Sequence, residues 1–238
     1  MPEPNRVAIV TGGNRGIGRA VAAALLKDGW RVDFCGRTEE SIRPTLDDLR
    51  DVYGDAVEAR PCNVRREEEV ESFVAATMEG RERIDLLVNN AGVGYFAPVD
   101  ELRGEDWRRV VETNLDGPFY FIRAVAPHMI ARGSGWIVNI ASLAARNPFA
   151  GGAAYNASKF GLLGLSDAAM LDLRHRGVRV TVILPGSVDT EFRDRPGTTD
   201  KEWMLAPDDV ARAVVDLVRY PDRALPSRIE LRPSHPPK

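Results

Sequence analysis

The feature that most constrains the fold is a regular alternation of β-branched apolar runs with Ala- and Leu-rich helical runs along the whole chain. Strands separated by helices predict βαβ units and a mostly parallel sheet with helices on both faces. The strand runs are almost wholly apolar, which is typical of strands buried on both sides. We expect strands at residues 6–10, 31–35, 56–59, 85–88, 136–141, 178–184 and 228–231. We expect helices at residues 18–28, 39–52, 67–78, 105–131, 153–175 and 207–219, with a bend in the fourth at Pro118 and Pro127.

Length and composition indicate one domain spanning residues 1–238 and limit the partners. The net charge is −3, and acidic residues lie beside each basic cluster, which argues against a nucleic-acid partner. No run approaches the roughly 18 apolar residues of a membrane-spanning helix, so we expect no membrane partner. Cys35 and Cys62 end apolar runs and are predicted to be free, buried thiols, which favours a cytoplasmic location. The tail after Arg232 is predicted to be disordered.

A glycine-rich segment, TGGNRGIG at residues 11–18, joins the first predicted strand to the first predicted helix. Glycines permit a tight turn and let a pyrophosphate approach the backbone closely, while a helix N-terminus offers free N–H groups and partial positive charge. This position predicts a dinucleotide-binding turn. Its candidate cofactor residues are Gly12, Asn14, Arg15, Gly16, Ile17 and Gly18.

Further motifs follow in a fixed order along the chain. They are NNAG at residues 89–92, Asn114, Ser142, the YNASK segment at 155–159, and Pro185-Gly186 with Thr190. Together with the G-x-x-x-G-x-G spacing of the turn, this set resembles the short-chain dehydrogenase/reductase family, and within it the NADP-dependent carbonyl and 3-oxoacyl reductases. The resemblance covers nearly the whole chain. It implies a Rossmann-like, doubly wound sheet of about seven strands and an oxidoreductase that moves a hydride between nicotinamide and a carbonyl/alcohol pair.

Four residues are candidates for catalysis: Asn114, Ser142, Tyr155 and Lys159. Hydride addition to a carbonyl builds negative charge on oxygen, which needs a proton donor and a hydrogen-bond donor. Tyr155 is the expected acid. Lys159 lies one helical turn later on the same face, where its ammonium favours the phenolate, and Ser142 is expected to hold the substrate oxygen. The resemblance implies that Lys159 also holds the nicotinamide ribose and that Asn114 holds a relay water.

The end of the second predicted strand points to NADP(H) as the cofactor. Enzymes that select NAD place an acid there to hold the ribose hydroxyls, and that acid would repel a 2′-phosphate. In this chain the position is Gly36, followed by Arg37, whose guanidinium suits a phosphate. Asp33 lies three residues earlier and is expected to point away. The further cofactor residues predicted are Asn63, Val64, Asn90, Ala91, Gly92, Tyr155, Lys159, Pro185, Gly186, Val188 and Thr190.

Two departures from the family pattern bear on function. Asn63 stands where many members carry an acid that contacts the adenine, although an amide also forms hydrogen bonds. Leu171 stands where acyl-carrier-protein reductases often carry an arginine, which weakens a role in fatty-acid synthesis. The predicted substrate is a medium-sized apolar ketone, aldehyde or 3-oxoacyl compound. Its expected pocket comprises Ser142, Leu143, Phe149, Tyr155, Gly186 and Ser187, with Tyr95, Phe96, Phe192 and Trp203 nearby.

Residues 190–201 are predicted to form a lid, and the two long helices to pack against a second copy in a homodimer or homotetramer. Three other functions remain open. They are a non-catalytic dinucleotide sensor or scaffold, an NAD-dependent alcohol dehydrogenase, and an epimerase or dehydratase. The presence of all four candidate catalytic residues argues against a sensor, and the chain length leaves no room for the larger substrate domain typical of the epimerases.

Overall fold

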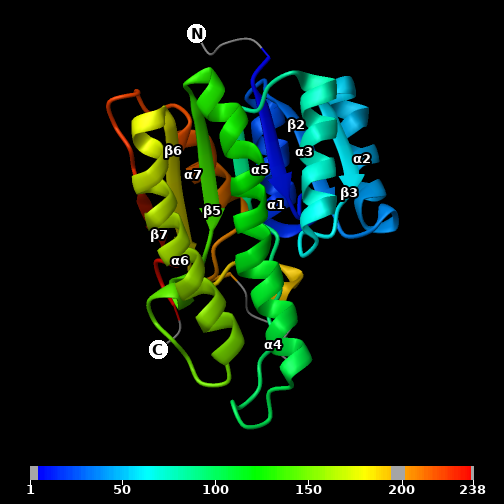
Figure 1. Cartoon of the computed structure of the whole chain (residues 1–238). Coiled ribbons are helices and arrows are strands. Elements are labelled where there is room, and N and C mark those ends of the chain that lie inside the picture. The colour runs from blue at the N-terminus through cyan, green and yellow to red at the C-terminus, as the bar shows by residue number, and fades with distance from the viewer. Residues whose placement is uncertain (1–4, 194–201, 237–238) are drawn as a thin grey trace.

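A single parallel sheet organises the chain, as Figure 1 shows for the computed structural model, which describes residues 5–193 and 202–236. The strands run in the order β3-β2-β1-β4-β5-β6-β7, and every neighbouring pair is parallel. Their bounds are β1 (Val7–Thr11), β2 (Arg31–Gly36), β3 (Val57–Pro61), β4 (Leu86–Asn89), β5 (Gly135–Ile140), β6 (Val178–Pro185) and β7 (Arg228–Leu231). The predicted doubly wound sheet is thereby confirmed.

Helices cover both faces of the sheet (Figure 1). Their bounds are α1 (Gly16–Lys27), α2 (Glu39–Tyr53), α3 (Glu67–Arg81), α4 (Gly104–Val111), α5 (Gly117–Arg132), α6 (Ala153–Leu173) and α7 (Pro207–Leu217). One core lies between the sheet and α1, α2 and α7, with Val21, Ile42 and Val214 fully buried. The other core lies beneath α3, α5 and α6, where the rings of Phe73 and Phe121 meet edge to face.

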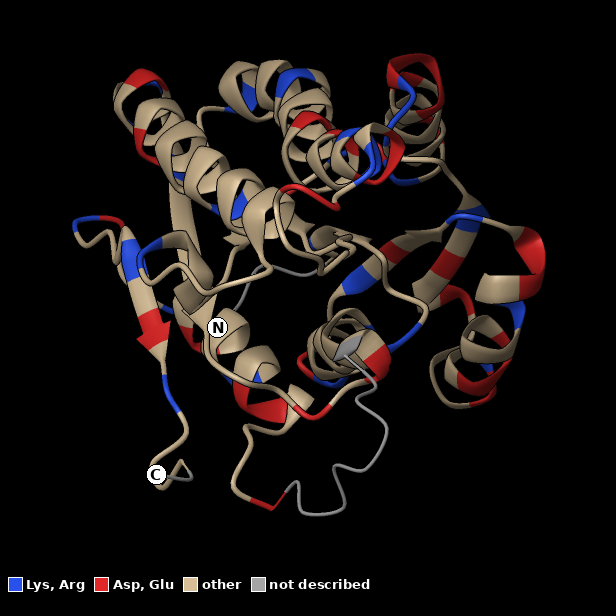
Figure 2. Cartoon of the chain, turned by 90° about the horizontal axis from the view of Figure 1, so that it is seen from below, with Lys and Arg blue, Asp and Glu red and all other residues tan. Residues whose placement is uncertain are grey.

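Burial along the strands follows their position in the sheet. All residues of β1, β4 and β5 are buried, whereas β3 and β7 at the edges are only partly covered. Central parallel strands need apolar side chains on both faces, which is why these runs are so uniform in sequence. None of the described helices is both long and apolar enough to cross a membrane. Lys and Arg are interspersed with Asp and Glu over the same helices (Figure 2).

The single helix predicted for residues 105–131 is wrong in one respect. It is divided into α4 and α5 by a π-helical turn, Glu112–Asp116, in which the Gly117 N–H donates to the Glu112 carbonyl five residues earlier. Pro118 explains the break, because it has no N–H to give to the carbonyl of Asn114 in an α-helical pattern. The widened turn presents Asn114 to the loop that follows β4.

The C-terminal tail also differs from expectation. Residues 233–236 are described and follow β7 back to the carboxyl edge of the sheet, where Pro233 and Pro236 line a cleft. Pro233 packs so tightly on Gly186 that a Cβ built on this glycine would lie 2.8 Å from the Pro233 Cδ. The tail is therefore part of the wall beside β6 and not a disordered extension, up to residue 236.

Candidate active site

The principal cleft lies at the carboxyl edge of the sheet and has a volume of about 1070 Å³. Segments that follow all seven strands line it, including Gly12 after β1, Arg37 after β2, Asn90 after β4 and Ser142 after β5. β1 and β4 are neighbours in the sheet. From β1 the chain continues to β2 and β3 on one side, and from β4 it continues to β5, β6 and β7 on the other side, so the strand order reverses between β1 and β4. Open α/β sheets bind ligands at such a reversal point. The volume is at the upper end of the range for ligand sites, with room for a dinucleotide and a second molecule.

The glycine turn is packed so closely that side chains would not fit. Gly12 and Gly16 have φ angles of +64° and +53°, which L side chains rarely adopt. A Cβ on Gly18 would lie 2.1 Å from the Gly12 carbonyl oxygen. Asn90 braces the turn from β4, since its side-chain amide donates to the carbonyls of Thr11 and Gly12 at 3.0 and 3.1 Å.

The N-terminus of α1 has no side-chain cap, in contrast to that of α2. Thr38 and Ser41 form a reciprocal capping box at α2, whereas Arg15 at the start of α1 makes no capping hydrogen bond and no acid occupies the first turn. Uncapped amides at the N-terminus of a 12-residue helix leave donors and partial positive charge directed into the cleft. This arrangement suits the pyrophosphate of a dinucleotide, and the side-chain-free turn gives it the close approach that it needs.

At the far end of the cleft, Arg37 is exposed directly after β2. In the part of the chain that the structure describes, no carboxylate pairs with its guanidinium. Asp33 points away from this end, as predicted. Its carboxylate is buried and accepts from Arg81 Nε at 2.9 Å and from Thr77 Oγ1 at 3.1 Å, both on α3.

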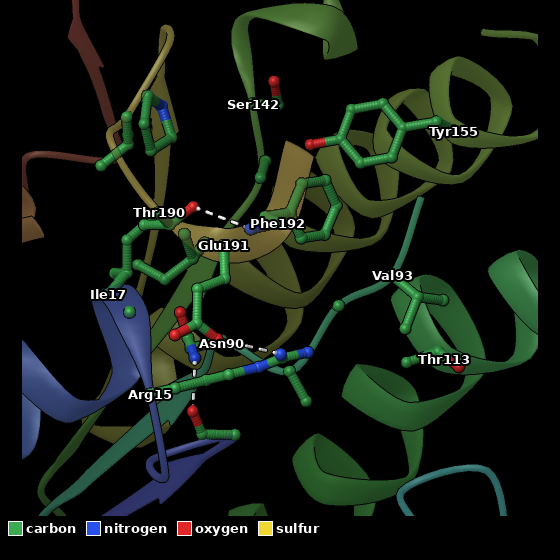
Figure 3. A pocket seen from close by; sticks show the side chains of 18 of the residues that line it. Arg15, Ile17, Asn90, Val93, Thr113, Ser142, Tyr155, Thr190, Glu191 and Phe192 are labelled. Carbon is green, nitrogen blue, oxygen red and sulfur yellow. Dashed lines mark hydrogen bonds and ion pairs between the residues drawn. The ribbon is translucent and has the colours of Figure 1, made fainter. Parts of the chain in front are cut away.

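Three polar side chains meet at the other end. Tyr155 and Lys159 lie one turn apart near the start of α6, and Ser142 follows β5. Figure 3 shows the Tyr155 hydroxyl and the Ser142 side chain facing the same space, and all three residues line the cleft. The Lys159 Nζ lies 5.8 Å from the centre of the Tyr155 ring and donates to the Ile140 carbonyl at 2.9 Å. Burial lowers the pKa of Lys159 to about 8, because an ammonium removed from water loses its hydration.

Ser142 is held in a defined orientation. Its Oγ accepts a hydrogen bond from the Ala144 N–H at 3.1 Å, at the start of a short 3₁₀ turn, Leu143–Ala145. Because the oxygen is used as an acceptor there, its O–H remains able to donate into the cleft.

Asn114 does not line the cleft. Its fully buried side chain accepts from the Val93 N–H at 2.8 Å and donates to the Val93 carbonyl and to Ser158 Oγ. Ser158 in turn donates to the Tyr155 carbonyl at 2.8 Å. Asn114 thus joins the π-helical turn, the loop after β4 and the start of α6. The relay water implied by the resemblance stays a prediction.

The segment after β6 contacts the glycine turn through Thr190 and Glu191. A Cβ on Gly16 would contact the Thr190 methyl at 3.3 Å, and Glu191 Oε2 lies 3.3 Å from Arg15 Nη1 (Figure 3). The predicted lid extends to residue 201, and its part from residue 194 onward lies outside the described residues.

Most of the residues singled out from sequence converge on this one cleft. Of the candidate catalytic and cofactor residues, Asn114 and Gly18 lie behind its wall, and the others line it. In the predicted substrate pocket, Tyr95 is outside the lining and its hydroxyl accepts from Arg109 at 3.0 Å. Sequence reasoning did not single out several other lining residues, among them Cys35, Cys62, Arg65, Arg109, Thr113, Pro233 and Pro236.

The signals for these missed residues were weak or misleading. Cys35 and Cys62 are free and buried, as predicted. They both line the cleft because β2 pairs with β3, which places the ends of these strands side by side. Arg109 and Thr113 reach the cleft because α4 and the π-helical turn pack beside the loop after β4. Among the described residues, no three His, Cys, Asp or Glu side chains are grouped to hold a metal ion.

Comparisons with known proteins agree with this geometry. Residues 6–201 match the family described as short chain dehydrogenase. A Streptomyces coelicolor protein assigned as a ketoacyl reductase is 43% identical over 190 residues, covering 79% of this chain and 72% of its own length. A metagenomic short-chain oxidoreductase crystallised with NADP is 36% identical, with a TM-score of 0.85 over 98% of this chain and 99% of its own. A variant of actinorhodin polyketide ketoreductase with NADPH is 35% identical, with a TM-score of 0.88 over 96% of each chain.

Proposed function

The chain belongs to the short-chain dehydrogenase family of oxidoreductases, and from this premise we propose that it is an NADP(H)-dependent carbonyl reductase. Its proposed substrate is a medium-sized apolar ketone, aldehyde or 3-oxoacyl compound. The observation that carries the proposal is one continuous cleft, of which one end suits a dinucleotide and the other suits a carbonyl substrate. An uncapped helix N-terminus beneath a glycine turn serves the dinucleotide, and Tyr155, Lys159 and Ser142 serve the carbonyl.

The cleft residues divide the work of binding and proton transfer. When bound, the reduced nicotinamide supplies the hydride that the carbonyl carbon accepts. Tyr155 gives its phenolic proton to the carbonyl oxygen, so that the product is the alcohol. The Lys159 ammonium stabilises the phenolate that is left. The Ser142 O–H donates to the same substrate oxygen and holds it in place as charge develops.

The charge state of Lys159 fits this role. With its pKa lowered to about 8, the side chain is mostly protonated at neutral pH and still close enough to titration to pass a proton onward. The hydrogen bond to the Ile140 carbonyl fixes the Nζ beside the Tyr155 ring. Turnover in the reductive direction should therefore fall as pH rises through the value at which this ammonium loses its proton.

The preference for NADP(H) rests on Gly36 and Arg37. Gly36 offers no carboxylate to repel a 2′-phosphate, and a Cβ there would lie only 2.6 Å from Ile42 Cγ2. Arg37 follows with an exposed guanidinium, which matches phosphate geometry and stays charged. The two structural relatives described above were crystallised with NADP or NADPH.

Assembly and location complete the proposal. Trp107, Phe119 and Leu171 are 41%, 43% and 54% exposed on α4, α5 and α6. We propose that a twofold copy covers such apolar side chains on these helices in a homodimer or homotetramer. A cytoplasmic location agrees with the free thiols of Cys35 and Cys62, because disulfides are rare in reducing compartments.

The test is the reduction of a panel of ketones, aldehydes and 3-oxoacyl thioesters with NADPH and with NADH. One charged hydrogen bond from Arg37 contributes about 1.5–3 kcal/mol, so Arg37→Ala should lower kcat/KM for NADPH about ten- to a hundredfold and leave NADH almost unchanged. Arg31→Ala is the matched control, an exposed arginine at the opposite end of the same strand. Equal kcat/KM with NADH in the wild type would overturn the NADP(H) preference, and a preference for NADH would identify an NAD-dependent dehydrogenase. Bound cofactor without turnover of any compound in the panel would favour a sensor.

A further inference from the structure

We propose that Phe96 and Phe192 form an aromatic clamp that makes the enzyme select carbonyl compounds carrying an aryl ring beside the carbonyl. The proposal rests on the reductase function proposed above and specifies its substrate class. It follows from the arrangement of rings around Tyr155, whose hydroxyl meets the substrate oxygen. Any group one or two bonds from that carbonyl must lie against the residues that flank the tyrosine.

The two clamp residues reach Tyr155 from different parts of the chain. Phe96 lies in the loop after β4, and Phe192 in the short turn Glu191–Arg193 after β6. Each ring centre lies 5.7 Å from that of Tyr155, with interplanar angles of 60° and 53°. Figure 3 shows the Phe192 ring beside the tyrosine. Phe149 extends the group, 5.8 Å from Phe96 and 6.4 Å from Tyr155.

Gly94 lies directly against the rings of Phe96 and Phe192. A Cβ on this residue would lie 2.7 Å from Phe96 Cζ and 3.2 Å from Phe192 Cε1, so both rings converge over the same glycine. The φ angle of Gly94 is not in the left-handed region, and the backbone there does not require glycine. The missing side chain is what lets the two rings approach each other and the tyrosine.

The clamp also leaves aromatic surface available to a ligand. Phe96 and Phe192 line the cleft together with Tyr155, and they are 37% and 40% exposed, so part of each residue is open to a ligand. A saturated substituent would cover this area as well as an aryl group does. An aryl ring gains in addition from tilted and edge-to-face contacts between ring quadrupoles, which favours it about 2- to 10-fold for each ring pair.

The experiment compares two ketones of the same shape class, phenylacetone and cyclohexylacetone, with NADPH as reductant. In both, a methylene separates the ring from the carbonyl, so the ring does not conjugate with the reacting group. The variants are Phe96→Leu and Phe192→Leu, which keep apolar volume and remove the ring, and Gly94→Ala, which displaces both rings without removing them. Tyr220→Leu is the control, because it removes a 48% exposed ring outside the cleft lining.

We expect the wild type to prefer phenylacetone in kcat/KM about 5-fold or more. Each of the three variants should lower that ratio about 2- to 10-fold, and the control should not change it. The inhibition constants of the unreactive analogues phenylacetamide and cyclohexylacetamide should follow the same order. Equal kcat/KM for the two ketones, or a preference that survives both leucine variants, would overturn the clamp and leave the reductase function standing. Failure to reduce any carbonyl compound would overturn both.

Discussion

Replacing Lys159 with Met should stabilise the cofactor-free protein at pH 7 while abolishing turnover. Lys159 is 4% exposed, and its Nζ donates a hydrogen bond to the Ile140 carbonyl. Burial is the cause of its lowered pKa, and no carboxylate within residues 5–193 and 202–236 compensates the charge. A buried charge held for chemistry costs folding free energy, and a residue that carries no charge should recover part of that cost.

The magnitude follows from the pKa. A fall from 10.5 to about 8 corresponds to about 3 kcal/mol of disfavoured charge in the folded state. Met retains an unbranched chain of similar length but leaves the Ile140 carbonyl without this donor, which costs about 1 kcal/mol. We therefore expect Lys159→Met to raise the free energy of unfolding by about 2 kcal/mol at pH 7.

The pH dependence has a definite sign. The unfolded lysine binds a proton up to about pH 10.5, whereas the folded one releases it near pH 8, so unfolding takes up a proton between these values. Wild-type stability should rise with pH across this window relative to that of the variant. The advantage of Lys159→Met is then largest below pH 8 and shrinks as the pH rises above it.

Urea unfolding followed by tryptophan fluorescence at pH 7, 8.5 and 9.5 measures this difference. Lys27→Met, at an exposed lysine that ends α1, is the control and should change stability by no more than about 0.5 kcal/mol. A Lys159→Met protein that is less stable than the wild type at pH 7, or a difference that does not shrink with pH, would refute the reasoning.

Two further substitutions test the surroundings of the cofactor site. Asp33→Asn should lower the free energy of unfolding by about 3 kcal/mol, because it leaves the buried Arg81 guanidinium uncompensated, without altering the ratio of NADPH to NADH efficiency; a loss below about 1 kcal/mol by urea unfolding, or an altered ratio, would contradict this. Glu191→Gln frees Arg15 from an exposed ion pair worth at most about 1 kcal/mol, so NADPH should bind up to about fivefold more tightly at low salt and the gain should vanish at high salt. Weaker NADPH binding in a fluorescence titration would instead mean that the Arg15–Glu191 pair holds the segment after β6 against the cofactor site.

Much of the fold could be predicted because its signals are local. Seven apolar runs became seven strands, and the orientation of Asp33 followed from its position in β2, with the carboxylate directed to Arg81 on α3. The carboxyl edge of a parallel sheet gathers whatever follows each strand. Residues as distant as Gly12, Asn90, Ser142 and Gly186 were therefore expected at one site before their contacts were known.

What escaped prediction depends on tertiary contacts. The missing N–H of Pro118 is visible in sequence, but a kink, a bend or a π-helical turn would each accommodate it. The hydrogen bonds of Asn114, in the π-helical turn, with Val93 and Ser158 join segments far apart in the sequence and could not be read from it. The sequence of the tail predicts disorder, and only the tertiary structure shows that Pro233 packs against Gly186, where a side chain would not fit. The clamp required knowing that Phe96 and Phe192 meet over Gly94.

The central claim is that Tyr155 gives the proton to the carbonyl oxygen, and single-turnover reduction by the Tyr155→Phe variant with NADPH already bound tests it most directly. The variant loses one hydroxyl and keeps the ring that contacts Phe96 and Phe192. A general acid contributes about 10²- to 10⁴-fold, so the rate of NADPH oxidation should fall by that factor while the Kd for NADPH stays within about twofold. A rate near that of the wild type, with a substrate that the wild type reduces well, would contradict the assigned chemistry.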